Sequence, residues 1–245
     1  MSRRVQKEVI LSTRRLRSER KLESRYLCSM NKFKGLRQAS HFGPTLIVTA
    51  IAFGFGTYYW WEGPAYVIAF TVATGQLIVG WSNDLYDFKD DLAHGRTNKP
   101  LVSGLITKQY LQKWLRFMVP FSFLANLLGP LGIKGGLVYM LGVAFGVAYN
   151  LYFKFSALSP LPYAVAFAAL PSSIAMSRDI TPPLWMLLGG AIFGMAAHFI
   201  NVIKDMEQDQ VSGIQGLPQR LGTNRSVIAA ITLIALGVLA LYLTM

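Results

Sequence analysis

Two short clusters hold most of the acidic side chains that follow residue 42. Nine Asp and Glu residues lie in that part of the chain, and seven of them fall within 84–91 or 205–209. Carboxylates gathered so closely repel one another, and a bound cation relieves that repulsion. Neither cluster contains cysteine or histidine, so oxygen ligands and a hard ion such as Mg²⁺ are expected.

The first cluster predicts a stripe of three carboxylates. At about 100° per residue on a helix, Asp84, Asp87 and Asp91 lie within an arc of roughly 60°. Asp90 keeps two interpretations: support for this stripe, or a solvated neighbour.

The second cluster repeats the pattern. Asp205 and Asp209 are four residues apart, Asn201 lies one turn earlier on the same helix face, and Glu207 points away. Mg²⁺ is usually held by a few carboxylates together with substrate phosphates. Two facing stripes of this kind predict a site that holds Mg²⁺ with a diphosphate between them. The alternative is a solvated charged surface, and the occurrence of two clusters at the ends of apolar runs argues against it.

Membrane helices are expected to carry both clusters. The chain of 245 residues is 53% apolar and 15% charged, which excludes an ordinary soluble globule. Several apolar runs are long enough to cross a hydrocarbon core of about 30 Å. The seven runs are 44–61, 64–82, 114–133, 135–153, 158–176, 183–203 and 226–245. We therefore predict an all-α, multi-span transmembrane helical bundle.

Basic residues set the expected orientation. Residues 1–42 contain 12 basic and 3 acidic side chains, and Lys and Arg in short connections favour the cytoplasmic side. With this segment inside, both acidic clusters are also inside, and only Lys134 and Arg178 lie outside. The prediction is a multi-pass protein of the cell (inner) membrane with a cytoplasmic N-terminus.

The basic stretch 1–35 is expected to be a cytoplasmic extension, and a basic amphipathic helix on an anionic leaflet is one interpretation. Nucleic acid is not an expected partner, because no recognition motif accompanies the charge. Met30 is an alternative start, in which case residues 1–29 are not translated. The single cysteine, Cys28, excludes an intrachain disulfide, and no cleaved signal peptide is expected.

The motifs resemble those of the UbiA superfamily of intramembrane prenyltransferases. Asn83-Asp84-x-x-Asp87-x-x-x-Asp91 and Asp205-x-x-x-Asp209 are similar to its pair of aspartate-rich motifs. Further elements match, and together they cover about residues 36–230: Arg96-Thr-Asn-Lys99-Pro100-Leu101, Tyr149-Asn150 with Lys154, and Gly213 with Leu217-Pro218-Gln-Arg220-Leu-Gly222.

The resemblance implies a helical bundle with a central cavity open to the cytoplasmic side, where Mg²⁺ and an isoprenyl diphosphate lie between the motifs. The implied metal ligands, which are also catalytic residues, are Asp84, Asp87, Asp91, Asp205 and Asp209. Lys154 is the sixth catalytic residue, and with Arg96 and then Lys99 it is implied to neutralise the diphosphate. The remaining residues of the implied substrate-binding set are Asn83, Tyr149, Asn201 and Arg220.

Several of these residues have plainer alternatives. The alternative role of Lys154 is to anchor a helix end at the membrane interface. The alternative for Tyr149 is an aromatic residue of the membrane belt, and the alternative for Asn201 is a hydrogen bond between helices. His198 is expected to be a packed or capping histidine rather than an acceptor contact.

The activity implied is Mg²⁺-dependent transfer of a polyprenyl group to a lipophilic acceptor, with an aromatic acid or quinone precursor as the leading acceptor. Family members usually have nine transmembrane helices, so residues 36–245 are expected to form a prenyltransferase membrane domain that is short at its C-terminus. A cation-binding transporter and an inactive scaffold of the same fold are the alternatives. Acids at the ends of spans disfavour transport, and the complete set of motif carboxylates disfavours the scaffold.

Overall fold

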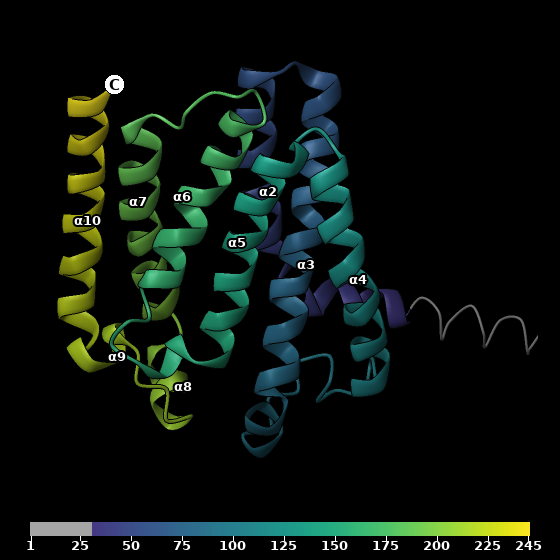
Figure 1. Ribbon diagram of the computed structural model, residues 1–245. Coiled ribbons are helices and arrows are strands. Elements are labelled where there is room, and N and C mark those ends of the chain that lie inside the picture. The colour runs from purple at the N-terminus through teal and green to yellow at the C-terminus, as the bar shows by residue number, and fades with distance from the viewer. Residues whose placement is uncertain (1–30) are drawn as a thin grey trace, which may run out of the picture.

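The computed structural model describes residues 31–245, and every regular element in that range is a helix. Most of the predicted basic extension, with the alternative start at Met30, lies outside the described residues. Seven longer helices form the bundle in Figure 1: α2 (Phe42–Tyr59), α3 (Glu62–Ala93), α4 (Lys108–Leu128), α5 (Gly132–Leu151), α6 (Leu161–Met176), α7 (Leu184–Ile203) and α10 (Thr223–Thr244). Four short helices accompany them: Asn31–Ala39, η1 (Phe153–Phe155), α8 (Met206–Val211) and α9 (Leu217–Leu221).

Each of the seven predicted apolar runs overlaps one of the seven longer helices. Four helices, α3, α5, α7 and α10, are long and apolar enough to cross a membrane, and Asn31–Ala39 with α2 forms a further candidate span bent by 67°. The apolar helix α6 is shorter, at 16 residues. The predicted all-helical transmembrane bundle is confirmed for the described residues.

The packing order places α3 at the centre of one half of the bundle. It packs against α2, α4 and α5, and the remaining helices continue the layer through α6 and α7 to α10 at the edge (Figure 1). Buried apolar side chains such as Ile68, Val72 and Leu111 fill the space around α3. Along the same helix, Thr74 Oγ1 donates to Ser122 Oγ over 2.8 Å, which ties α3 to α4 by a buried polar contact.

The turn before α2 lies directly against α3. His41 has a left-handed backbone, with φ 49° and ψ 60°, where the chain bends into α2. A Cβ on Gly80 would lie 2.8 Å from the Ser40 carbonyl oxygen, so only glycine permits this approach of the two backbones. Trp81 Nε1 donates to the Leu36 carbonyl oxygen over 3.1 Å, which holds Asn31–Ala39 on α3.

Helix α3 continues well past the apolar run 64–82 and ends at Ala93. Its polar last turns carry the first acidic cluster. The chain alternates direction between successive long helices, so the end of α3, η1, α8 and α9 all lie at one end of the bundle (Figure 1). This topology brings the two acidic clusters to the same end.

Candidate active site between two aspartate motifs

Three carboxylates of α3 each pair with a basic side chain from a following segment. Asp84 Oδ1 lies 2.9 Å from Lys99 Nζ, and Asp91 Oδ1 lies 2.7 Å from Arg96 Nη1. Asp87 pairs with Lys154. The carboxylate repulsion expected from the sequence is therefore balanced by three cations of the chain itself.

The local backbone structure brings these basic side chains next to α3. The Arg96 amide donates to the Asp91 carbonyl oxygen over 2.9 Å, and the Lys99 amide donates to the Arg96 carbonyl oxygen over 3.0 Å, so the connection after α3 folds back along the helix. Lys154 comes from η1, directly after α5, and is only 6% exposed. Arg96, Lys99 and Lys154 thus surround one face of α3.

Asp84, at one end of the stripe, is only 2% exposed. His41 Nε2 lies 3.2 Å from its Oδ1, and Asn83 Nδ2 lies 3.5 Å from the same imidazole nitrogen. Asp84 Oδ2 is buried and has no hydrogen-bond partner within residues 31–245. An unpartnered buried carboxylate oxygen is costly, which makes this atom a candidate ligand for a cation.

Asp90 lies at the margin of the stripe. Its carboxylate is 35% exposed and pairs with Arg96 at 3.3 Å and with His94 at 3.1 Å. These contacts fit a supporting role through Arg96 better than an unbound solvated neighbour.

The second cluster does not lie on one continuous helix, and this part of the sequence interpretation is wrong. Helix α7 ends at Ile203 and α8 begins at Met206, with Asp205 between them at φ −110° and ψ 9°. Aspartate favours the N-cap position over a helix interior, and Asp205 is the N-cap residue of α8, although its side chain makes no capping hydrogen bond. Asn201 is therefore not in register with Asp205 and Asp209, and its Nδ2 donates to Tyr163 Oη over 3.3 Å.

Asp209 is held by a residue that follows it in the chain. Gln219 Nε2 donates to Asp209 Oδ2 over 2.8 Å. Burial raises the pKa of Asp209, the Gln219 hydrogen bond offsets part of this rise, and the charge of Asp205 adds to it. Asp205 itself has no side-chain ion pair within residues 31–245.

Arg96 joins the two clusters. Besides its contact with Asp91, its Nη2 donates to Ser212 Oγ over 2.5 Å, at the end of α8. Burial alone would lower the pKa of Arg96, but the hydrogen bond and charge of Asp91 outweigh it and raise the pKa. Lys99 behaves in the same way with Asp84. Both side chains stay charged between the motifs.

Tyr149 lies in the last turn of α5, five residues before the Lys154 that pairs with Asp87. Its ring packs edge-on against Tyr163 and His198, with centroids 5.2 and 5.4 Å away. Arg220 Nε donates to the Gln215 carbonyl oxygen over 2.8 Å, and Arg220 has no ion pair within residues 31–245.

The sequence interpretation missed three polar neighbours of the motif aspartates: His41, Ser212 and Gln219. His41 precedes the first apolar run, and Gln219 is the unspecified residue of Leu217-Pro218-Gln-Arg220, so neither carried a signal as a motif residue. His198 is buried as expected, with Nε2 2.9 Å from Ser159 Oγ.

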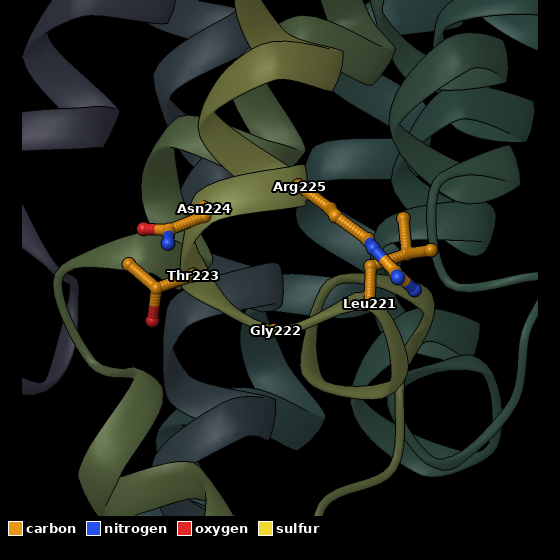
Figure 2. Close-up of a pocket in the computed structure, with 5 residues that line it drawn as sticks. All are labelled: Leu221, Gly222, Thr223, Asn224 and Arg225. Carbon is orange, nitrogen blue, oxygen red and sulfur yellow. The ribbon is translucent and has the colours of Figure 1, made fainter.

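The described residues do not display the predicted central cavity. Figure 2 shows a pocket of about 340 Å³ at the start of α10, lined by Leu221, Gly222, Thr223, Asn224 and Arg225. A second pocket, of about 300 Å³, lies beside Gln219 and Arg220. No group of three or more His, Cys, Asp or Glu side chains within residues 31–245 is arranged to hold a metal ion. Protein ligands alone thus do not make a closed metal site.

Comparisons with known proteins agree with this fold. A UbiA homolog from Archaeoglobus fulgidus bound to DMAPP and Mg²⁺ superposes with a TM-score of 0.72 at 19% identity, over 84% of this chain and 76% of that one. The same homolog bound to GPP and Mg²⁺ gives 0.69 at 18% identity, over 87% and 76%. A structure described as digeranylgeranylglyceryl phosphate synthase gives 0.65 at 17% identity, over 85% and 76%.

No curated protein sequence matched the chain. The family model of the UbiA prenyltransferase family matches residues 42–245, which include both aspartate motifs and the three cations Arg96, Lys99 and Lys154. The chain belongs to the UbiA prenyltransferase family.

Proposed function

We propose that this protein is a Mg²⁺-dependent integral-membrane prenyltransferase. It transfers an isoprenyl group from an isoprenyl diphosphate to a lipophilic acceptor dissolved in the bilayer. The observation that carries the proposal is the meeting of the two aspartate motifs at one end of the bundle, joined by Arg96. Family membership supports it, as do relatives of the same fold bound to DMAPP or GPP with Mg²⁺.

The donor atoms present fit Mg²⁺. All five proposed ligands, Asp84, Asp87, Asp91, Asp205 and Asp209, offer carboxylate oxygens, which Mg²⁺ prefers. Asp84 Oδ2 is buried and has no partner within residues 31–245. The absence of a closed three-ligand cluster from the same residues suits an ion that takes its remaining ligands from phosphate and water.

The three cations have a second task in this proposal. Arg96, Lys99 and Lys154 pair with the motif carboxylates when no donor is present. When the donor binds, they would move to the phosphate oxygens and leave the carboxylates free to hold Mg²⁺, so no charge would be left buried alone. Arginine suits this exchange because its planar fork binds two phosphate oxygens together.

Transfer begins when the allylic carbon–oxygen bond of the donor breaks. The bond electrons leave with the diphosphate, where Arg96, Lys99 and Lys154 stabilise the charge that develops. Bound Mg²⁺ would supply further neutralisation of this leaving group. The acceptor attacks the allylic cation, a new bond to carbon forms, and the acceptor loses a proton. The surrounding apolar helices keep water from the cation.

We assign supporting roles to the remaining residues. Asn83 and Asn201 orient the two ends of the site, Tyr149 lies where it orients the donor or steadies positive charge, and Arg220 binds substrate from the α9 side. A hydroxylated aromatic acid or quinone precursor is the proposed acceptor. The proposed location is the cell (inner) membrane, with the N-terminus and both motifs cytoplasmic.

The decisive experiment measures transfer of a labelled prenyl group in membranes that contain the full chain, with a panel of prenyl diphosphates and acceptors. We expect transfer that is lost on chelation and falls at least about 100-fold in Asp84→Asn and in Asp205→Asn. Asp179→Asn is the matched control, because this carboxylate lies in the connection between α6 and α7. Mg²⁺-dependent donor binding without product would favour the inactive scaffold, and the absence of both binding and transfer would refute the proposal.

A further inference from the structure

Ser159 is a buried junction near the proposed site. It lies in the connection between η1 and α6 and is fully buried. Its Oγ accepts a hydrogen bond from the Leu217 amide over 2.9 Å and lies 2.9 Å from His198 Nε2. One hydroxyl therefore contacts three parts of the chain: its own connection, α7 and the start of α9.

The hydroxyl can serve both neighbours. A serine oxygen has one hydrogen to donate and two lone pairs, so it accepts from Leu217 and still bonds with His198 in either imidazole tautomer. His198 is also fully buried and packs against Tyr149 and Tyr163, which fixes its ring. A polar pair enclosed in this way is costly to leave half satisfied.

On one side of the junction lies the first motif. Short turns run from Lys154 to Ser159, with the Ser159 amide donating to the Ser156 carbonyl oxygen over 3.1 Å. Lys154 pairs with Asp87 on α3. Ser159 is therefore joined by short turns to the cation that contacts the first motif.

On the other side lies the second motif. Gln219 follows Leu217 by two residues and donates to Asp209 over 2.8 Å. The same segment is packed tightly, because a Cβ on Gly216 would lie 2.9 Å from Ser159 Oγ and 3.2 Å from the Lys154 carbonyl oxygen. Only glycine allows the α9 segment to approach this closely.

We propose that Ser159 and His198 are positioning residues that set the separation between Lys154 and the Gln219–Asp209 pair. They act through these neighbours and do not touch the substrate. The inference rests on the proposed function, because the spacing matters only if one diphosphate must be held from both motifs. These two residues affect the binding of the donor and leave the rate of the reaction step unchanged.

The test uses the full chain in lipid nanodiscs with four substitutions. Ser159→Ala and His198→Phe each remove the hydrogen bond between these two side chains. His198→Gln keeps a side-chain amide near the Nε2 position. Ser173→Ala is the matched control, because Ser173 is equally buried but its Oγ donates only to the Leu170 carbonyl oxygen of its own helix. Two readouts are measured: steady-state transfer, and hydrogen exchange of the peptide that contains the Leu217 amide.

We expect Ser159→Ala and His198→Phe to raise the KM for prenyl diphosphate about tenfold, with kcat within about twofold of the wild type, because a lost buried hydrogen bond weakens donor binding. Exchange of the Leu217 peptide should accelerate in both variants without any donor present. His198→Gln should restore most of both properties, and Ser173→Ala should change neither.

Two failures are distinguishable. An active wild type in which Ser159→Ala matches Ser173→Ala in KM and in Leu217 exchange would overturn the positioning role alone. A wild type without Mg²⁺-dependent donor binding or transfer would overturn the proposed function, and this inference with it. A loss of kcat with an unchanged KM in Ser159→Ala and His198→Phe would also overturn the positioning role, since that pattern belongs to a residue acting on the reaction step.

Discussion

The first motif lies on one continuous helix and is neutralised by cations of the chain, whereas the second is built at a break between helices. Asp84, Asp87 and Asp91 project from α3, and each pairs with a cation. Asp205 and Asp209 lie at the start of a six-residue helix, where Asp209 pairs with the neutral Gln219. The first motif is thus neutralised by cations of the chain, whereas the second has no side-chain ion pair within residues 31–245 and would gain one from a bound cation.

The largest expected effect concerns the buried pair of the first motif. Lys99→Ala leaves Asp84, which is 2% exposed, without its main cation and should lower the free energy of unfolding by about 3 kcal/mol. Unfolding in mixed micelles by a denaturing detergent measures this loss. If the first motif holds metal, added Mg²⁺ should restore part of the stability. A loss no larger than that of Lys134→Ala would contradict the picture of a neutralised motif.

The next effect tests the connection between the motifs. Arg96→Lys keeps the charge but cannot contact both Asp91 and Ser212, so kcat/KM should fall roughly thirtyfold. Ser212→Ala removes only the contact with the second motif and should cost about fivefold. Steady-state kinetics with saturating Mg²⁺ make the measurement. Equal losses in the two variants would show that Asp91 adds nothing to the role of Arg96.

A smaller effect concerns the backbone beside the first motif. His41 has φ 49°, where glycine is unstrained and alanine is not. His41→Ala and His41→Gly both lose the contact with Asp84, so their difference isolates the backbone. We expect the alanine variant to be less stable by about 1 kcal/mol in the same unfolding assay. Equal stabilities would mean that the turn relaxes once the imidazole is removed.

The smallest effect is expected at the opposite end of the bundle. Lys134 Nζ lies 2.9 Å from Asp179 Oδ1, and the hydrogen bond and charge of Lys134 lower the pKa of Asp179 below its ordinary value. This contribution is present above the unfolded pKa and disappears as the pH falls through the folded pKa. Because both side chains are exposed, Asp179→Asn should unfold like the wild type at neutral pH. A clear loss of stability would show that this end is more enclosed than its exposure indicates.

The sequence predicted the helices and the first motif better than the second. Apolar run length predicts spans because the bilayer demands them, and a 3.6-residue period places Asp84, Asp87 and Asp91 on one face wherever a helix persists. The same helical period does not predict that α7 ends at Ile203. Partners brought in by tertiary packing, such as Ser212 for Arg96, were equally invisible, because their separation along the chain carries no period.

The length of α3 has a consequence for where the reaction takes place. Its 32 residues extend about 48 Å, whereas a hydrocarbon layer of about 30 Å accommodates roughly twenty of them. Counted from Glu62, these twenty residues end at Trp81, about one turn before Asp84, so the first motif begins near the boundary between hydrocarbon and water. Membrane thickness should therefore affect activity. Longer acyl chains would draw Asp84 and Lys99 into the hydrocarbon layer and weaken binding of the donor diphosphate, although the sequence is unchanged.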